Sequence, residues 1–169
     1  VDDGLVAEAE FIIEYSNKHW GHSLSLDDYR EHWAEMWGVP DEEVERRADV
    51  FHSPGVIQMY RILDGAQQAL KTLSKDYKLL FLTSRRKLVK DETLEWLADN
   101  FEGIFDEVHF TGFWDTVAED RHLLSKAELS REIGADYIID DQPKHCFGAA
   151  EAGVKAVLFG DYAESRRLK

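Results

Sequence analysis

Hydrophobic positions in the first third of the chain recur at the three- and four-residue spacing of amphipathic helices. Residues 11–15 hold the inward face of a first helix. A second stripe covers residues 26–37; it follows Ser25, and Asp28 three residues later completes a capping-box pattern. Pro40 and the acidic residues after it open a third helix, because proline and carboxylates are favoured in a first helical turn. The sequence therefore predicts a helical segment at the start of the chain.

The pattern changes after residue 64, where short apolar runs begin to alternate with amphipathic helices. The apolar runs lie at residues 79–82, 108–110, 137–139 and 156–159. Short runs of this kind, separated by helices, are typical of a parallel sheet that is covered on both faces. We therefore expect a doubly wound, Rossmann-like α/β core formed by residues 1–6 and 64–169. Residues 7–63 would be inserted into it as a helical cap.

Length and charge narrow the class of protein. The chain has 169 residues, of which 44% are hydrophobic, so it can form one packed domain but not two independent ones. Its formal net charge is −14, which disfavours nucleic-acid polymers and anionic membranes as partners. A small phosphate ester remains a suitable partner wherever a metal ion and a lysine reverse the local field. The oligomeric state stays open, with a homodimer among the options.

Cys146 is the single cysteine, which excludes an internal disulfide and fits a reducing, cytoplasmic setting. No apolar run approaches the length of a membrane span, and the first residues do not have the pattern of a signal peptide. Val1 is not a usual first residue, so we expect the chain to begin inside a longer sequence.

Polar residues follow the first apolar run of the core at Thr83, Ser84 and Arg85. A hydroxyl at a strand end, followed by backbone N–H groups that enter a helix, suits a phosphate oxygen. The simpler interpretation is a capping hydroxyl beside a surface arginine, and this segment alone does not decide between the two.

Asp140 and Asp141 follow the third apolar run. Adjacent carboxylates at the mouth of a buried strand repel each other, and a hard cation such as Mg²⁺ relieves that repulsion. A helix cap before Pro143 is the competing interpretation. Lys126, at the start of a predicted helix, is by itself an ordinary surface lysine; it gains a role only beside carboxylates and a phosphate.

An acidic opening at Asp2, then Thr83, Lys126 and the Asp140–Asp141 pair, in that order, resembles the haloacid dehalogenase-like phosphatase superfamily. Its members are expected to carry an Asp-x-Asp motif, a Thr or Ser, a Lys and an acidic pair. Within the superfamily, the chain is similar to the 5′(3′)-deoxyribonucleotidase-like branch. That finer similarity involves residues 23–29, 82–97, 105–112, 125–128 and 139–154.

The opening of the chain departs from the family pattern. In the better register Val1 is the middle residue of Asp-x-Asp and Asp2 its second aspartate, so the nucleophilic aspartate would stand immediately before Val1. The strand that carries it, central in the family's sheet, would also lie upstream, and a sheet without that strand should leave backbone groups unpaired. A second register places Val1 at the nucleophile and Asp3 at the acid, which would describe an inactive relative.

The resemblance implies a mechanism and a set of roles. The upstream aspartate would form an aspartyl-phosphate, with Asp2 as general acid and base. Mg²⁺ would be held by the carboxylate of the upstream aspartate, by the backbone carbonyl of Asp2 and by Asp140, with Asp141 bound directly or through water. Thr83 and Lys126 would hold the phosphoryl oxygens, and Ser84 and Arg85 would also bind substrate.

The cap is expected to determine specificity. Trp33 and Trp37 could stack on a nucleobase, although an aromatic stripe at helical spacing is more often the core of a helical insert. We expect a nucleotidase that acts on nucleoside monophosphates. A phosphatase for sugar or other small phosphate esters and a catalytically inactive phosphate-binding relative are the alternatives.

Overall fold

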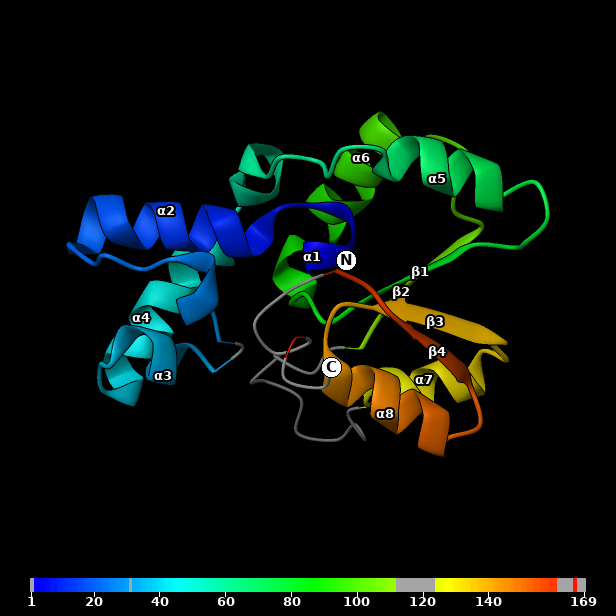
Figure 1. Cartoon of the computed structure of the whole chain (residues 1–169). Helices are drawn as coiled ribbons and strands as arrows, with labels where there is room; N and C mark the ends of the chain where they lie inside the picture. Colours follow the sequence, from blue (N-terminus) through cyan, green and yellow to red (C-terminus); the bar gives the residue numbers. More distant parts are fainter. Residues whose placement is uncertain (1, 31, 112–123, 161–165, 167–169) are drawn as a thin grey trace.

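The computed structural model describes residues 2–30, 32–111, 124–160 and 166. Two pairs of short strands form its centre, and helices lie on either side of them (Figure 1). The strands are β1 (Leu80–Thr83), β2 (Glu107–Phe110), β3 (Tyr137–Asp140) and β4 (Lys155–Leu158). The helices of this part are α5 (Ala66–Leu73), α6 (Lys90–Phe101), α7 (Lys126–Glu132) and α8 (Pro143–Glu151), with a 3₁₀ turn η3 (Lys87–Val89). Helices α5 and α6 cover one side, and α7 and α8 cover the other.

The first third of the chain is helical, as predicted. It contains α1 (Asp2–Leu5), α2 (Glu8–Trp20), α3 (Trp33–Trp37), α4 (Asp41–Phe51) and the 3₁₀ turns η1 (Leu26–Asp28) and η2 (Val56–Met59). Helices α2, α3 and α4 share a cluster built on Ile12, Met36, Trp37 and Phe51. Two chain segments join these helices to the rest of the molecule, and they run antiparallel through a bridge between Val6 and Ile62.

The predicted helix over residues 26–37 is wrong in its continuity, although its start is right. Ser25 and Asp28 form the capping box, but only the short turn η1 follows it. The Arg30 guanidinium donates to the carbonyl of Asp27 at 2.8 Å and to that of Tyr29 at 2.7 Å. In a continuing helix these carbonyls would accept from backbone N–H groups four residues on. The side chain thus replaces the backbone donors, and the helix restarts only at α3.

All four predicted strands are present, and they pair in parallel as β1 with β2 and β3 with β4. Thr83 is opposite Phe110, and Asp140 is opposite Leu158. Among the described residues β1 and β3 are not paired with each other. Leu82 of β1 nevertheless packs against the cluster that contains Ile138 of β3. The carboxyl ends of β1 and β3, where the candidate residues lie, therefore belong to neighbouring parts of the molecule.

The sequence predicts a sheet covered on both faces, and in the part of the chain that the structure describes one face of β3 and β4 is about half exposed. Tyr137, Ile139 and Val157 are 50%, 55% and 48% exposed. Ile138, on the other face of β3, packs with Ala149 of α8. Helix α8 packs on that face and contacts α7. On the opposite face Tyr77 lies against Tyr137, with 6.3 Å between the ring centres.

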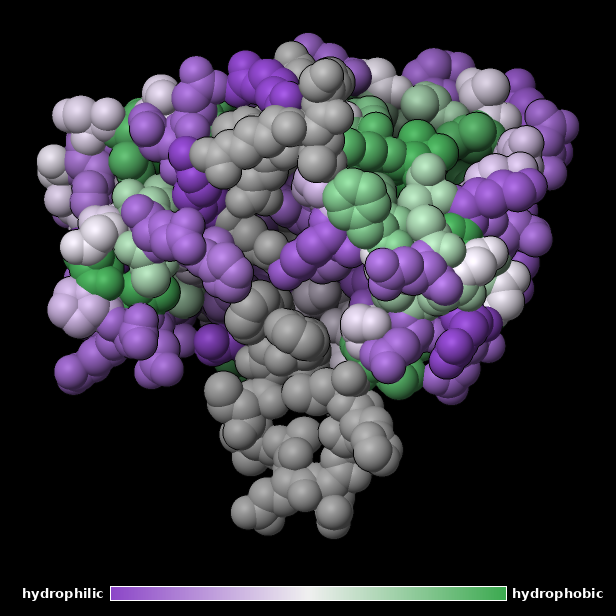
Figure 2. Space-filling view, turned by 60° about the horizontal axis from the view of Figure 1, so that its bottom comes forward, coloured by the Kyte–Doolittle hydropathy of each residue, from purple (hydrophilic) through white to green (hydrophobic). Residues whose placement is uncertain are grey.

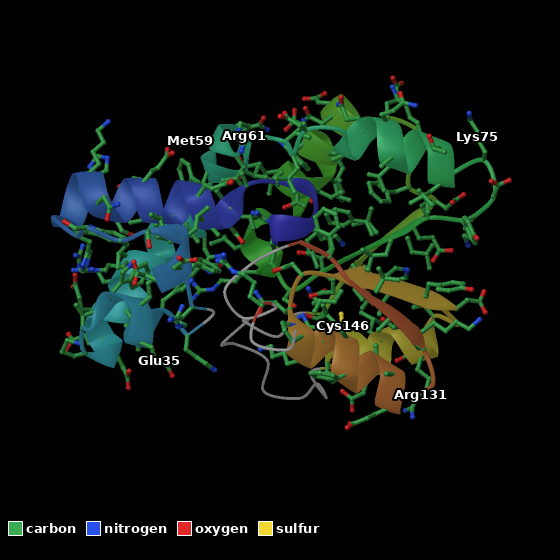
Figure 3. The ribbon with its side chains drawn as sticks, viewed as in Figure 1. Glu35, Met59, Arg61, Lys75, Arg131 and Cys146 are labelled. Atoms are coloured by element: carbon green, nitrogen blue, oxygen red, sulfur yellow. The ribbon has the colours of Figure 1, made fainter. Side chains whose placement is uncertain are left out.

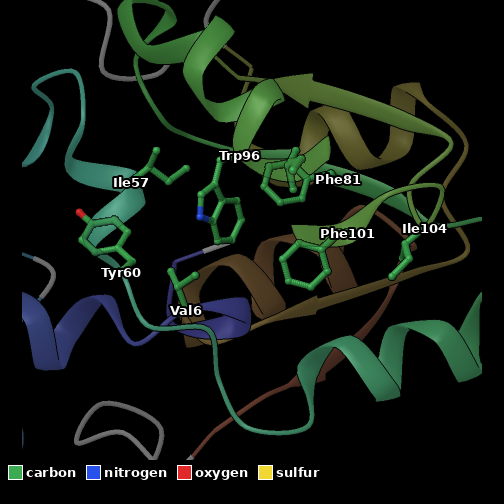
Figure 4. Packing of buried hydrophobic residues seen from close by; sticks show 8 residues of the cluster. Val6, Ile57, Tyr60, Phe81, Trp96, Phe101 and Ile104 are labelled. Carbon is green, nitrogen blue, oxygen red and sulfur yellow. The ribbon is translucent and has the colours of Figure 1, made fainter. Parts of the chain in front are cut away.

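The main hydrophobic core lies between β1, α6 and the segment that leads out of the cap (Figure 4). It consists of Val6, Ile57, Tyr60, Phe81, Trp96, Leu97, Phe101 and Ile104. The predicted boundaries between core and cap, at residues 6–7 and 63–64, stay a prediction. Ile57 and Tyr60 of the predicted cap pack against residues of the predicted core.

Candidate functional site

Thr83 ends β1 and is fully buried. Its Oγ1 accepts the backbone N–H of Arg85 at 3.1 Å, and its own carbonyl accepts the N–H of Thr111 at 2.9 Å. The hydroxyl therefore shapes the turn after β1, and it still has an O–H to donate to an anion. Both the capping and the phosphate-binding interpretation of this residue agree with the position.

Arg85 is not the surface residue of the simpler interpretation, because only 6% of it is exposed. Its Nη2 lies 3.6 Å from Oε1 of Glu8, the first residue of α2. Its guanidinium carbon lies 5.1 Å from the centre of the Tyr60 ring. The positively charged guanidinium of Arg85 is thus held between the turn after β1 and the two segments that join the cap to the core. Ser84, the other predicted substrate-binding residue here, is half-buried.

Asp140 ends β3 and forms a buried ion pair with Lys126, the first residue of α7. Lys126 Nζ lies 2.8 Å from Asp140 Oδ2. The other carboxylate oxygen, Oδ1, accepts the backbone N–H of Gln142 at 2.9 Å and faces Nδ1 of His145 at 3.1 Å. Burial alone would raise the pKa of Asp140, but His145 and Lys126 outweigh it and hold the pKa well below its ordinary value. Asp140 is therefore an anion at neutral pH.

Asp141 is equally buried, and its Oδ2 accepts the side-chain amide of Gln142 at 3.0 Å. Two adjacent carboxylates, both nearly excluded from solvent, are the donors that Mg²⁺ prefers. The residues present therefore fit the predicted cation. No group of three or more metal-ligating side chains occurs in the part of the chain that the structure describes. The third predicted ligand is Asp2.

The structure leaves the role of Asp2 untested. Asp2 begins the short helix α1. Its side chain lies outside the described part of the structure. Its predicted roles as general acid and metal ligand stay predictions.

The two tryptophans proposed for nucleobase stacking lie in the cluster of the cap helices. Trp37 is buried, and its Nε1 donates to Ser16 Oγ at 3.0 Å. Trp33 is half-buried and stacks on His52, with 6.0 Å between ring centres. Trp37 has the structural role that the simpler interpretation assigns to both residues, whereas Trp33 keeps an exposed part that could meet a ligand.

Sequence reasoning did not identify His145 and Gln142. Both belong to the first turn of α8, which Pro143 opens at its first helical position. Gln142 is the N-cap residue, and His145 stands three residues later, where side chains commonly reach back toward the helix start. The sequence signal for His145 was its position two residues after Pro143 and five after Asp140, which places a polar side chain in the first turn of the helix after the acidic pair. Cys146, the next residue, faces the strands from α8 (Figure 3), with its Sγ 3.6 Å from the Asp140 carbonyl.

The face shown in Figure 2 is largely hydrophilic, with a group of apolar side chains at the upper right and smaller apolar groups at the left. None of the described helices combines the length and the apolar composition that crossing a membrane requires.

Comparison with known proteins finds two relatives by sequence. No protein-family model matches the chain. It is 23% identical over 163 residues to the Bacillus subtilis protein named "Putative nucleotidase YqfW", covering 93% of this chain and 76% of that protein. It is 21% identical over 165 residues to "Putative nucleotidase BH1399" of Halalkalibacterium halodurans, covering 97% and 78%.

A solved structure matches as well. The chain superimposes with a TM-score of 0.65 on the haloacid dehalogenase-like hydrolase SP0104 from Streptococcus pneumoniae, at 17% identity, covering 97% of this chain and 84% of that one. The predicted α/β fold is thereby confirmed, and it is the fold of a haloacid dehalogenase-like hydrolase. The finer branch stays a prediction.

Proposed function

We propose that this chain, which has the fold of the haloacid dehalogenase-like hydrolases, belongs to a magnesium-dependent phosphomonoester hydrolase that acts on nucleoside monophosphates. The observation that carries the proposal is the buried Lys126–Asp140 pair beside Asp141 at the carboxyl end of β3, with buried Thr83 at the carboxyl end of β1. Buried charges are costly to maintain unless they are paired or bind a ligand. Sheets of this type bind ligands at the carboxyl ends of their strands.

Each of these residues has a task that follows from its chemistry. Thr83 donates its O–H to a phosphoryl oxygen, and the charge of Arg85 attracts the phosphate dianion. Lys126 neutralises charge that develops on the phosphoryl group. Because Asp140 fixes the Lys126 ammonium at 2.8 Å, this charge is positioned before the substrate arrives.

The covalent step follows from the resemblance to the superfamily. A carboxylate oxygen of the aspartate expected before Val1 attacks phosphorus, and the ester P–O bond breaks. Asp2 gives its proton to the departing oxygen and later removes a proton from the water that cleaves the aspartyl-phosphate. Mg²⁺, held by Asp140, Asp141 and the Asp2 carbonyl, would offset the repulsion between the nucleophile and the phosphate dianion.

A nucleotide substrate is supported by the names of the two relatives, both of which mention a nucleotidase. In the cap, the base would meet the exposed part of Trp33, since Trp37 is buried. Other small phosphate esters need the same machinery and differ only in what the cap must recognise. The acidic net charge of −14 favours such small partners over nucleic-acid polymers and membranes.

The test is phosphate release from a panel of nucleoside monophosphates and sugar phosphates, with and without Mg²⁺. It is run on this chain and on a version extended upstream of Val1. We expect magnesium-dependent release that varies with the base, and loss of that release in Asp140→Asn, which keeps the shape of the side chain but not its charge.

Equal rates on nucleotides and sugar phosphates would favour the general phosphatase. A folded, metal-binding protein that releases phosphate from no ester would contradict the enzyme proposal and favour an inactive phosphate-binding relative.

A further inference from the structure

The first turn of α8 holds the Asp140 carboxylate in one orientation. Oδ1 accepts from the backbone N–H of Gln142 at 2.9 Å and contacts His145 Nδ1 at 3.1 Å. Oδ2 accepts from Lys126 Nζ at 2.8 Å. A carboxylate offers about four lone-pair positions, and Oδ1 uses both of its own here. Among the described residues only Lys126 donates to Oδ2, so this is the oxygen that can bind a cation.

The contact with His145 is a hydrogen bond of defined direction. Ionised Asp140 has no proton to give, so Nδ1 of His145 must carry the hydrogen and donate it. From this arrangement we infer that His145 is a positioning residue, which fixes the Asp140 carboxylate so that Oδ2 is presented to a divalent cation. This inference rests on the proposed function, because it requires the metal site assigned there.

The backbone donor alone does not achieve the same result. The terminal torsion of an aspartate is broad, so a carboxylate held by one backbone donor and a flexible lysine can still rotate. The imidazole is rigid, and only 20% of its side chain is exposed, which limits its own freedom. Replacing a group that orients a metal-binding carboxylate in this way commonly changes metal affinity by about 10- to 100-fold.

The same turn also fixes the second carboxylate. Gln142 donates its side-chain amide to Asp141 at 3.0 Å while its backbone N–H serves Asp140. Gln142 and His145 thus hold both acidic side chains from one helix start. His145 is the better test position, because its contact comes from a side chain that can be replaced without altering the backbone.

Two substitutions separate the ring nitrogens of His145. In His145→Asn an amide N–H replaces Nδ1 at the same distance from Cβ, whereas in His145→Gln the amide corresponds to Nε2. The control is His109→Gln, since His109 Nε2 contacts the exposed Glu107 at 3.0 Å on β2. Far-UV circular dichroism and thermal unfolding confirm that each variant is folded. Mn²⁺ serves as the probe, and its affinity is measured from the electron paramagnetic resonance signal of the free ion.

We expect the unaltered chain, His145→Asn and His109→Gln to bind Mn²⁺ with similar affinity, and His145→Gln to bind about 10-fold more weakly or worse. The inference is overturned if His145→Gln binds as tightly as the unaltered chain, if His145→Asn is as weak as His145→Gln, or if the unaltered chain binds no Mn²⁺. Expected affinities without hydrolysis of any ester support the inference and contradict only the proposed function.

Discussion

At the scale of single residues, the Lys126–Asp140 pair is the feature that mutation should reveal most clearly. The two side chains are 6% and 5% exposed, so replacing either one leaves an uncompensated charge in the interior. We expect Lys126→Met to lower the free energy of unfolding by about 3–5 kcal/mol, measured by urea denaturation. The matched control is Lys78→Met, whose partner Glu107 is exposed, and we expect a loss of at most about 1 kcal/mol there. Equal losses of unfolding free energy in Lys126→Met and Lys78→Met would contradict this prediction, because they would show that water reaches the Lys126–Asp140 pair.

Among the cap residues, His22 should make stability depend on pH. Arg47 Nη1 lies 2.8 Å from His22 Nε2, and because arginine can only donate, this nitrogen must be unprotonated. Burial, and secondarily the charge of Arg47, lower the pKa of His22 below 6.5. Unfolded chains therefore bind more protons than folded ones in this range. The contribution of His22 to the free energy of unfolding is complete above about pH 6.5. It is lost as pH falls through the pKa that His22 has in the folded chain.

The measurement is the midpoint of thermal unfolding between pH 8 and pH 5, followed by tryptophan fluorescence. His22→Gln keeps an acceptor for Arg47 and should flatten the decline toward low pH, whereas His19→Gln should not. A decline of the same steepness in His22→Gln would assign the pH dependence to other groups. Glu43 acts in a separate window, because hydrogen bonds from Arg46 and Arg47 lower its pKa from 4.5 to about 2. Its contribution is lost only as pH falls from 4.5 toward 2.

At the scale of elements, Arg85 connects the turn after β1 to the start of α2 through Glu8. If Arg85 binds the phosphate, Glu8 competes with that phosphate for the same cation. We expect Glu8→Gln to tighten the binding of inorganic phosphate about fivefold, since removing a competing partner of this kind is worth on the order of 1 kcal/mol. Isothermal titration calorimetry measures the effect.

The control for this prediction uses the neighbouring arginine. Arg86 pairs with Asp49 of α4 at 3.1 Å, and Asp49 is largely exposed. Asp49→Asn should leave phosphate binding unchanged. Weaker binding in Glu8→Gln would mean that Glu8 holds Arg85 in place and does not compete for it.

The two halves of the chain differ in how far the sequence predicts them. Strands and helices after residue 64 were predicted because buried apolar runs and amphipathic stripes determine them locally. The interruption of the helix at Arg30 was not predicted, because it depends on which backbone carbonyls the Arg30 guanidinium contacts in the folded chain. The order of Thr83, Lys126 and Asp140 predicted the candidate site, and the structure brings Lys126 and Asp140 together. The contact of His145 with Asp140 was not predicted, because the spacing after Asp140–Asp141 does not tell which atom the imidazole reaches until the start of α8 is placed.

At the scale of the whole molecule, burial distinguishes two adjacent isoleucines on β3. Ile138 is 8% exposed and packs against α8, whereas Ile139 is 55% exposed on the opposite face. Ile138→Ala should cost about 2–5 kcal/mol of unfolding free energy, as for other buried aliphatic side chains. Ile139→Ala should cost less than about 1 kcal/mol.

The comparison uses the same substitution at neighbouring positions, so helix and strand propensities cancel and only the two faces differ. Urea denaturation of both variants measures the difference. A large loss for Ile139→Ala would mean that this face is covered in solution by residues outside the described part of the chain or by a second copy. Concentration dependence of the loss would identify the second copy, because dissociation of a dimer depends on protein concentration and intramolecular packing does not.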